Sequence, residues 1–286
     1  MTLIKTITEH GSQINSFYLL KDNRVAACSN DKVKRVYNPN KDYQCDEIIK
    51  KRNTILGTIC QLDNGTIISC SRSNSIIIGD SYTINNAHSQ LILKMIPLPD
   101  NRIVSCSSDD TIKIWRASPP YSDTPITTLK EHTKCISSIH YIKERDVLLS
   151  VTTNGILVFW SMSTYQCITV IERVHCYFIN GMYQMDNDRV ILGGYKKMYI
   201  INIKKTKIED IIDNKFKYIR CFLKLRENNM ILCGTEKGLF ALYDMNTKKY
   251  SIFQSDHRAS INDLIRIDDN TFMSCSDDKT IKLWKY

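Results

Sequence analysis

The amino-acid sequence predicts an all-β protein built from a repeated unit of roughly 40 residues. Residues 105–115 have the sequence SCSSDDTIKIW, and residues 274–284 repeat it almost unchanged as SCSDDKTIKLW. Within these copies apolar and polar residues alternate, which is typical of strands. Turn-forming residues such as Asp63-Asn64-Gly65 separate the alternating runs, so we expect short antiparallel strands joined by hairpins.

Weaker copies of the unit fill the rest of the chain. The residues that align with the two tryptophans lie 36 to 45 positions apart, and they are Tyr37, Gly79, Trp115, Trp160, Asn202, Tyr243 and Trp284. Five of the six histidines lie 27 or 28 residues before one of these positions, and His140 is the exception. Histidine placement therefore follows the repeat. Seven units of four strands predict a radial array of small sheets.

On these residues the chain resembles the WD40 repeat family, whose unit runs from a Gly-His or similar pair to a Trp-Asp or similar pair. The resemblance covers the whole chain and is specific in copies 3 and 7. It is looser elsewhere because other residues replace the Trp, namely Tyr37, Gly79, Asn202 and Tyr243, and no copy has a literal Trp-Asp. It implies one domain over residues 1–286, a seven-bladed β-propeller of four-stranded antiparallel blades. It also implies that residues 2–7 form the outer strand of the last blade, built from residues 258–286, which leaves no open sheet edge.

The resemblance further implies a buried hydrogen-bond relay in a blade, from an Asp through a His and a Ser or Thr to the Trp indole. The matching residues are His88, Ser105, Asp109 and Trp115 in copy 3 and His257, Ser274, Asp278 and Trp284 in copy 7. Copy 4 has Asn154 in place of the Asp. Copies 2, 5 and 6 have Ser73, Lys196 and Lys237 there, so we expect those blades to depend on packing alone.

No pattern in the sequence predicts an enzyme. It has no Gly-rich phosphate loop, no Gly-x-Ser-x-Gly elbow and no His-Glu-x-x-His. The His, Ser and Asp residues that could suggest a catalytic triad recur with the period, which favours a structural role. The eleven cysteines include no Cys-x-x-Cys pair, so we expect neither a metal site nor a cofactor. An enzyme at the channel mouth stays as an alternative, because propellers can host active sites.

Composition bounds the location and the partners. With 286 residues and 43% apolar content, the chain is long enough for one substantial core. It has no apolar run of about 18 residues and no signal-like leader, so we expect no membrane span and an intracellular protein, cytoplasmic or alternatively nuclear. The net charge of +9 and lysine clusters such as Lys32-Val33-Lys34-Arg35 could attract anions. Solvated strand edges and turns also account for such lysines, and we favour that interpretation.

Partner contacts in proteins that the chain resembles often come from one face of the ring, the top face, which carries the turns before the Trp strands. The aromatic, large apolar and arginine residues at the matching positions are Ile55, Arg72, Leu91, Leu93, Phe178, Tyr195, Tyr218 and Arg220. These residue types dominate binding hot spots, so we expect a partner peptide or protein there. Alternatively, some of these side chains pack inward around the channel.

The sequence therefore predicts a non-enzymatic interaction scaffold, a monomeric propeller that binds other proteins within a complex. Two alternatives remain open. One is an anion-binding module for nucleic acid or phosphoinositide, which would use the lysine-rich surface. The other is a substrate-receptor subunit of a larger complex such as a ubiquitin ligase.

Overall fold

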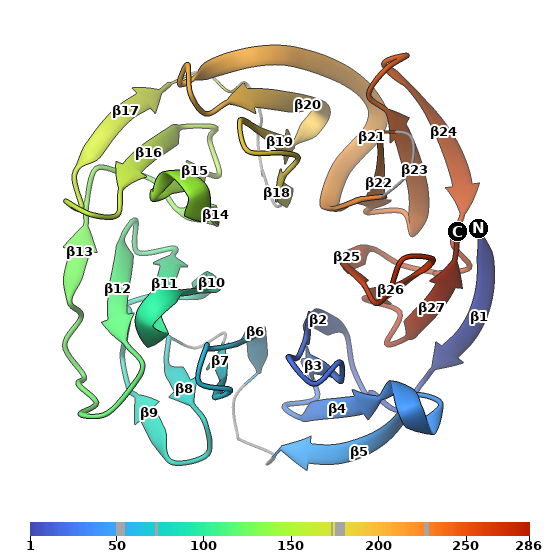
Figure 1. Ribbon diagram of the computed structural model, residues 1–286, viewed down its shortest axis with the longest axis horizontal. Helices are drawn as coiled ribbons and strands as arrows, with labels where there is room; N and C mark the ends of the chain where they lie inside the picture. The colour runs from blue at the N-terminus through green and yellow to red at the C-terminus, as the bar shows by residue number, and fades with distance from the viewer. Residues whose placement is uncertain (50–54, 72–73, 173, 175–180, 226–228) are drawn as a thin grey trace.

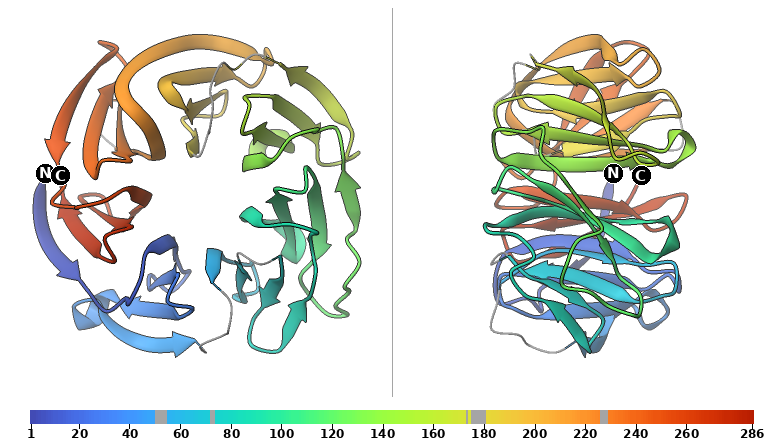
Figure 2. Two further views of the ribbon diagram at one scale, coloured as in Figure 1. Left: turned by 180° about the vertical axis from the view of Figure 1, so that it is seen from behind. Right: turned by 90° about the vertical axis from the view of Figure 1, so that its left-hand side faces the viewer.

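Four-stranded sheets stand like blades around a central axis in the computed structural model, and together they form a ring (Figures 1 and 2). The structure describes residues 1–49, 55–71, 74–172, 174, 181–225 and 229–286. Strands dominate these residues, and three short 3-10 helices lie in turns at Pro39–Lys41, Pro99–Asn101 and Lys143–Arg145. None of the helices in the described part of the chain is long and apolar enough to cross a membrane.

Each of the first four blades uses four consecutive strands, and the first strand of each is the innermost. Blades 1 and 2 contain β2 (Ile14–Leu19), β3 (Val25–Ser29), β4 (Lys34–Asn38), β5 (Gln44–Ile49), β6 (Leu56–Gln61), β7 (Ile67–Ser71), β8 (Ile76–Ile78) and β9 (Tyr82–Ile84). Blades 3 and 4 contain β10 (Ile92–Leu98), β11 (Arg102–Ser107), β12 (Ile112–Arg116), β13 (Thr127–Leu129), β14 (Ile136–Ile142), β15 (Val147–Thr152), β16 (Leu157–Ser161) and β17 (Cys167–Ile171).

Blades 5 and 6 share one long strand, β21 (Lys207–Lys224). Its first part pairs with β20 as the outer strand of blade 5, and from Ile219 onward it pairs with β22 as the inner strand of blade 6. The other strands of the two blades are β18 (Gly181–Gln184), β19 (Arg189–Gly193), β20 (Tyr195–Asn202), β22 (Met230–Thr235), β23 (Leu239–Asp244) and β24 (Lys249–Gln254). The seven blades of the described residues therefore form six hydrogen-bonded sheets, one of which has seven strands.

Blade 7 joins the two ends of the chain, as the sequence predicted. It contains β25 (Ile261–Arg266), β26 (Thr271–Ser276) and β27 (Ile281–Lys285), and β1 (Thr2–Ile7) is its outer strand. β1 pairs antiparallel with β27, with Leu3 opposite Trp284 and Ile7 opposite Ile281. Figure 1 shows the two termini side by side on the rim of the ring. This pairing gives β27 a partner along its outer edge.

The hydrophobic core lies between the blades. Among the described residues each pair of neighbouring blades encloses its own apolar cluster; Tyr37 of blade 1 and Cys275 of blade 7, for example, belong to one cluster across the closure. The cysteines that share a position in the repeat are all fully buried: Cys28, Cys70, Cys106 and Cys275. They fill space in packed strands, which is the role the sequence predicted.

Candidate functional site

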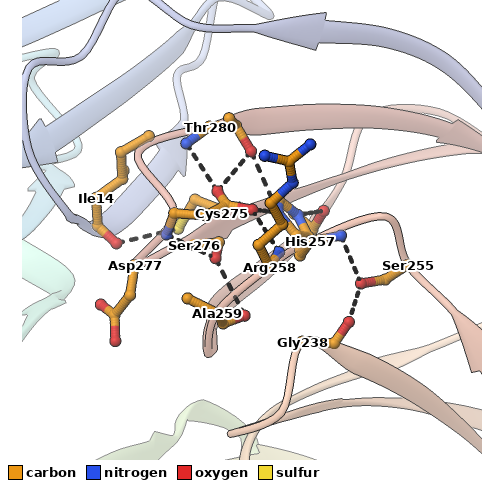
Figure 3. A network of polar contacts seen from close by, with 12 residues as sticks. Ile14, Gly238, Ser255, His257, Arg258, Ala259, Cys275, Ser276, Asp277 and Thr280 are labelled. Atoms are coloured by element: carbon orange, nitrogen blue, oxygen red, sulfur yellow. Dashed lines mark hydrogen bonds and ion pairs between the residues drawn. The ribbon is translucent and has the colours of Figure 1, made fainter.

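Among the described residues, two blades carry the complete relay, and it holds a turn of the top face. In blade 7 the Trp284 indole N–H lies 2.8 Å from Ser274 Oγ, and Ser274 Oγ lies 2.7 Å from His257 Nε2. His257 Nδ1 lies 2.8 Å from a carboxylate oxygen of Asp278. An indole N–H only donates, so the Ser hydroxyl donates to Nε2 and Nδ1–H donates to the carboxylate. Figure 3 shows His257 with its neighbours Ser255, Arg258 and Thr280.

Blade 3 repeats the arrangement, with distances of 2.9 Å between Trp115 Nε1 and Ser105 Oγ, 2.7 Å between Ser105 Oγ and His88 Nε2, and 2.9 Å between His88 Nδ1 and Asp109. Burial lowers the pKa of His88, and the Asp109 carboxylate opposes this shift. Burial alone would raise the pKa of Asp109, but hydrogen bonds from Thr111 and His88 bring it down to about 2. The pair is therefore a neutral imidazole beside a carboxylate.

Ser105 and Ser274 are fully buried, and each is bonded to both a His and a Trp. A nucleophilic serine needs access to a substrate carbonyl and an oxyanion site beside it. The relay instead ends on the top face, where Asp278 accepts the backbone N–H of Arg258 at 3.0 Å. Its geometry serves to fix the top-face turns.

Other blades carry parts of the relay and leave buried polar atoms unpaired. In blade 4, Ser150 Oγ bonds both His132 Nε2 at 2.6 Å and Trp160 Nε1 at 2.7 Å, but His132 Nδ1 has no partner. Asn154, which replaces the Asp, accepts from Thr152 instead. In blade 1, where Ala27 replaces the Ser, His10 Nε2 and the Tyr37 hydroxyl have no partner.

Blade 6 differs from the expectation that packing alone holds it. Lys237 occupies the Asp position, but the preceding Glu236 accepts the backbone N–H groups of Lys217 and Tyr218 at 3.1 and 2.9 Å. This resembles the bond from Gly11 N–H to Asp31 in blade 1. The carboxylate has moved by one residue and still ties the top turn to the inner strand. Ser73 of blade 2 lies outside the described residues.

A ring of bulged residues lines the mouth of the central channel. The register of the inner strand shifts at one equivalent residue in five blades, and these residues are Asn15, Leu93, Ser137, Arg220 and Asn262. The residue before each is almost completely buried: Ile14, Ile92, Ile136, Ile219 and Ile261. A bulge re-aims the side chain that it carries. All five bulged residues line one cavity of about 580 Å³.

Much of this mouth is polar and internally bonded. The Asn262 amide donates to Asp277 at 2.7 Å and to the Ile14 carbonyl of the next blade at 2.8 Å. The equivalent Asn15 donates to Asn30 at 2.7 Å and to the carbonyl of Leu56, again in the next blade. Arg220 Nη1 donates to Asn262 Oδ1 at 3.0 Å. Side chains at one repeat position therefore link blades 6, 7, 1 and 2.

Two charged residues lie deeper in the cavity wall, directly after bulged residues. Burial raises the pKa of Asp263 to about 6, although its carboxylate accepts from Phe17 N–H at 3.4 Å and from the Ser16 hydroxyl at 3.2 Å. Burial lowers the pKa of Lys94, and the Asp263 charge partly opposes this. Lys94 Nζ donates to Ser138 Oγ at 3.2 Å. Sequence analysis missed both, because a charged residue on an alternating strand is normally expected to face solvent.

The residues proposed for partner binding lie in two groups. Ile55, Leu91 and Leu93 are 38%, 48% and 37% exposed, and Leu93 lines the cavity. Tyr195 and Tyr218 are half-buried, with ring centroids 5.6 Å apart, and Arg220 lines the cavity from the same side. Arg72 and Phe178 lie outside the described residues. The cavity thus joins Leu93 of blade 3 to Arg220 of blade 6.

The lysine clusters do not all form the basic surface that the composition suggests. Within the described ranges, no group of three or more His, Cys, Asp or Glu side chains is placed to hold a metal. Lys34 of the first lysine cluster is buried. Arg35 beside it pairs with Asp31 at 2.7 Å and contacts His10 at 2.9 Å. That cluster is largely part of the blade 1 relay region.

Comparisons with known proteins agree with this geometry. Residues 79–116 and 248–285, copies 3 and 7, match the family model described as WD domain, G-beta repeat. The chain is similar over 98% of its length to the crystal structure titled "WD40 beta propeller domain of Doa1", with a TM-score of 0.80 and 14% identity, covering 95% of that chain.

Three curated proteins are similar over shorter stretches. The nuclear distribution protein nudF of Aspergillus niger is 27% identical over 32% of this chain and 20% of its own length. The WD repeat-containing protein 55 homolog of Dictyostelium discoideum is 27% identical over 45% of this chain and 31% of its own length. Pre-mRNA-processing factor 17 of Mus musculus is 21% identical over 68% of this chain and 27% of its own length. The matches thus span less than a third of each relative. Residues 79–116 and 248–285 are thus WD40 repeats, and the described residues of the chain fold as a seven-bladed β-propeller.

Proposed function

We propose that this protein is a non-enzymatic interaction scaffold that binds a partner protein or peptide on its top face, at the channel mouth. The observation that carries the proposal is the apolar rim, formed by Ile55, Leu91 and Leu93, which is exposed beside a cavity of about 580 Å³. Large apolar side chains gathered beside a polar cavity favour an interaction site. The relays that fix the top turns supply a rigid support, which lowers the entropy cost of binding.

A scaffold accounts for the buried relays better than an enzyme does. The serine, histidine and aspartate of blades 3 and 7 are engaged in hydrogen bonds that hold the fold. Two charged residues of the cavity, Lys94 and Asp263, lie on opposite sides of the ring, in blades 3 and 7. Each is bonded to a serine hydroxyl of a neighbouring blade, Lys94 to Ser138 and Asp263 to Ser16. The same relatives and the same fold leave the partner and the pathway open, including a role in a ubiquitin ligase.

Affinity capture with matched variants tests the proposal. The wild-type chain and the variant Leu91→Ser/Leu93→Ser/Arg220→Ala would be immobilised and exposed to a cell extract, followed by mass spectrometry. A control variant, Lys204→Ala/Lys205→Ala, changes two exposed residues just after β20. They lie at the other end of this strand from Tyr195. We expect partners of the wild type to be retained by the control and lost from the top-face variant. Equal capture by both variants would contradict the proposal, as would turnover of a substrate by the purified chain.

A further inference from the structure

A second cluster on the top face combines aromatic rings with lysines, and we call Tyr195, Lys196, Lys217 and Tyr218 the basic patch. Tyr195 begins β20 and lies opposite Tyr218 in β21, which passes from blade 5 to blade 6 here. The two rings contact each other with centroids 5.6 Å apart. Lys196 Nζ lies 5.5 Å from the centroid of Tyr195, and Lys217 Nζ lies 5.6 Å from that of Tyr218.

The lysines cover the faces of the two rings, and this decides what the patch can bind. Exposed ring faces would suit the stacking of nucleic-acid bases. Here a lysine ammonium lies over each ring, and the rings meet at 59°, so neither offers an open parallel platform. A cation held over an aromatic face loses part of its side-chain freedom before it binds an anion. The patch is therefore better suited to carboxylates or phosphates than to bases.

The local charge balance also favours an anionic ligand. Residues 195–197, 213–220 and 236–237 include six basic side chains and two acidic ones. Both carboxylate oxygens of Glu236 already accept backbone N–H groups, from Lys217 and Tyr218. The other acidic residue, Asp213, lies 4.0 Å from Lys197. Lys196 and Lys217 are both exposed. The net positive charge thus lies close in the chain to Arg220, which lines the cavity at the channel mouth.

The apolar rim lies on the other side of the same cavity. Leu93 lines it from blade 3, and Arg220 lines it from blade 6 beside the basic patch. Figure 1 shows the inner strands of these blades, β10 and β21, across the channel from each other. An extended segment that crosses the mouth would therefore meet apolar side chains at one end and lysines at the other.

We infer that the partner segment is an acidic peptide with one apolar end, which crosses the channel mouth with its carboxylates on the basic patch and its apolar residues on the apolar rim. This inference rests on the proposed function and adds the chemistry and the orientation of the ligand. Arg220 Nη1 is bonded to Asn262, which fixes its guanidinium at the cavity between the two surfaces. The basic patch selects the acidic end because charge complementarity contributes specificity.

Selection from a random peptide display library on the immobilised full chain tests this inference. We expect enriched peptides to contain clustered Asp or Glu at one end and Leu, Ile or Phe at the other. On the variant Lys196→Glu/Lys217→Glu we expect the acidic residues to disappear from the enriched set, and the best wild-type peptide to bind at least about tenfold more weakly, equivalent to about 1.4 kcal/mol. On Leu91→Ser/Leu93→Ser the acidic residues should persist and the apolar ones should be lost.

The matched control is Lys204→Glu/Lys205→Glu, which changes the charge equally at the opposite end of β20. Circular dichroism verifies the fold of each variant. Enrichment of peptides without acidic residues, or equal loss of affinity in the control, would overturn the inference but leave the scaffold proposal standing. No enrichment by the wild type would contradict the scaffold proposal itself. Binding of single-stranded oligothymidylate that Tyr195→Ala/Tyr218→Ala abolishes would assign the patch to nucleic acid instead.

Discussion

The closure seam and the apolar rim differ although they share one position of the repeat. The closure seam consists of Ile14, Ser16 and Phe17 of blade 1 with Asn262, Asp263 and Cys275 of blade 7, and hydrogen bonds cross it at four points. Figure 3 shows Ile14 and Cys275 within it. The apolar rim has Leu93 where the seam has Asn262, and its side chains project without such bonds. The repeat thus supplies a position, and the residue there decides whether it joins blades or faces a partner.

The largest expected effect comes from removing β1, the outer strand of blade 7, which precedes the closure seam in the chain. Deletion of residues 1–8 removes β1 and leaves β27 with an unpaired edge. It also exposes the part of the core that the buried Ile7 side chain fills. Loss of Ile burial alone costs about 1.5–3 kcal/mol, and the lost strand pairing adds to it. We expect the free energy of unfolding in urea to fall by about 3 kcal/mol or more. Ile4→Ser, at an exposed position of the same strand, is the control. Unchanged stability after the deletion would show that β1 does not close the ring.

A single substitution compares the two regions at one repeat position. Asn262→Ala removes the bonds to the Ile14 carbonyl, to Asp277 and from Arg220, so partly buried polar groups lose their partners. We expect a loss of about 1–3 kcal/mol in unfolding free energy. Leu93→Ala, the matched variant in blade 3, should change it by less than about 0.5 kcal/mol because the side chain is exposed. Equal losses in urea denaturation would remove the distinction between seam and rim.

The seam should also depend on pH through Asp263. Burial raises the pKa of this carboxyl to about 6, above its unfolded value of 3.8, so the native state holds the proton more tightly. The native chain therefore loses stability as pH rises from about 4 to about 6. We expect the unfolding free energy of Asp263→Asn to rise by about 1–2 kcal/mol relative to that of wild type between pH 4 and pH 6. Above pH 6 the difference between the two proteins should stay constant. Chemical denaturation at pH 4, 5, 6 and 7.5 measures the difference. A difference that does not vary with pH would place the Asp263 carboxylate outside the buried environment.

The smallest expected effect on stability is at the rim. Leu91→Ser/Leu93→Ser replaces exposed side chains that belong to none of the apolar clusters of the described residues. We expect its melting temperature to match that of wild type, and its binding of the dye ANS to decrease because exposed apolar surface is removed. A clear drop in melting temperature would mean that the two leucines pack inward and hold the blade.

The fold could be predicted from sequence because repetition determines it. The spacing of residues such as Trp115 and Trp284 predicted the blades, and the spare strand before His10 predicted the closure. The long strand shared by blades 5 and 6 was not predicted, because Asp213 and Asn214 are turn-forming residues that indicate a break there, whereas strand pairing continues on both sides of them. Glu236 was also missed, because it performs the role of the Asp from one residue earlier.

The candidate site was less predictable, because side-chain direction there depends on bulges. A bulge reverses the alternation of a strand at one residue, so Lys94 and Asp263 line the channel although the simple pattern does not indicate it. The lysine count was also a weak guide. Lys34 is buried, whereas Lys196 and Lys217 lie over tyrosine rings, and the sequence does not distinguish these environments.

The most direct test of the account is the affinity of the best library-selected peptide for the wild type, for Leu91→Ser/Leu93→Ser and for Ile4→Ser, measured by fluorescence anisotropy. The account predicts a dissociation constant at least about tenfold larger for the rim variant and an unchanged one for Ile4→Ser. It also predicts equal stability of all three proteins. Equal affinity of the rim variant and the wild type would contradict the claim that the top face holds the partner.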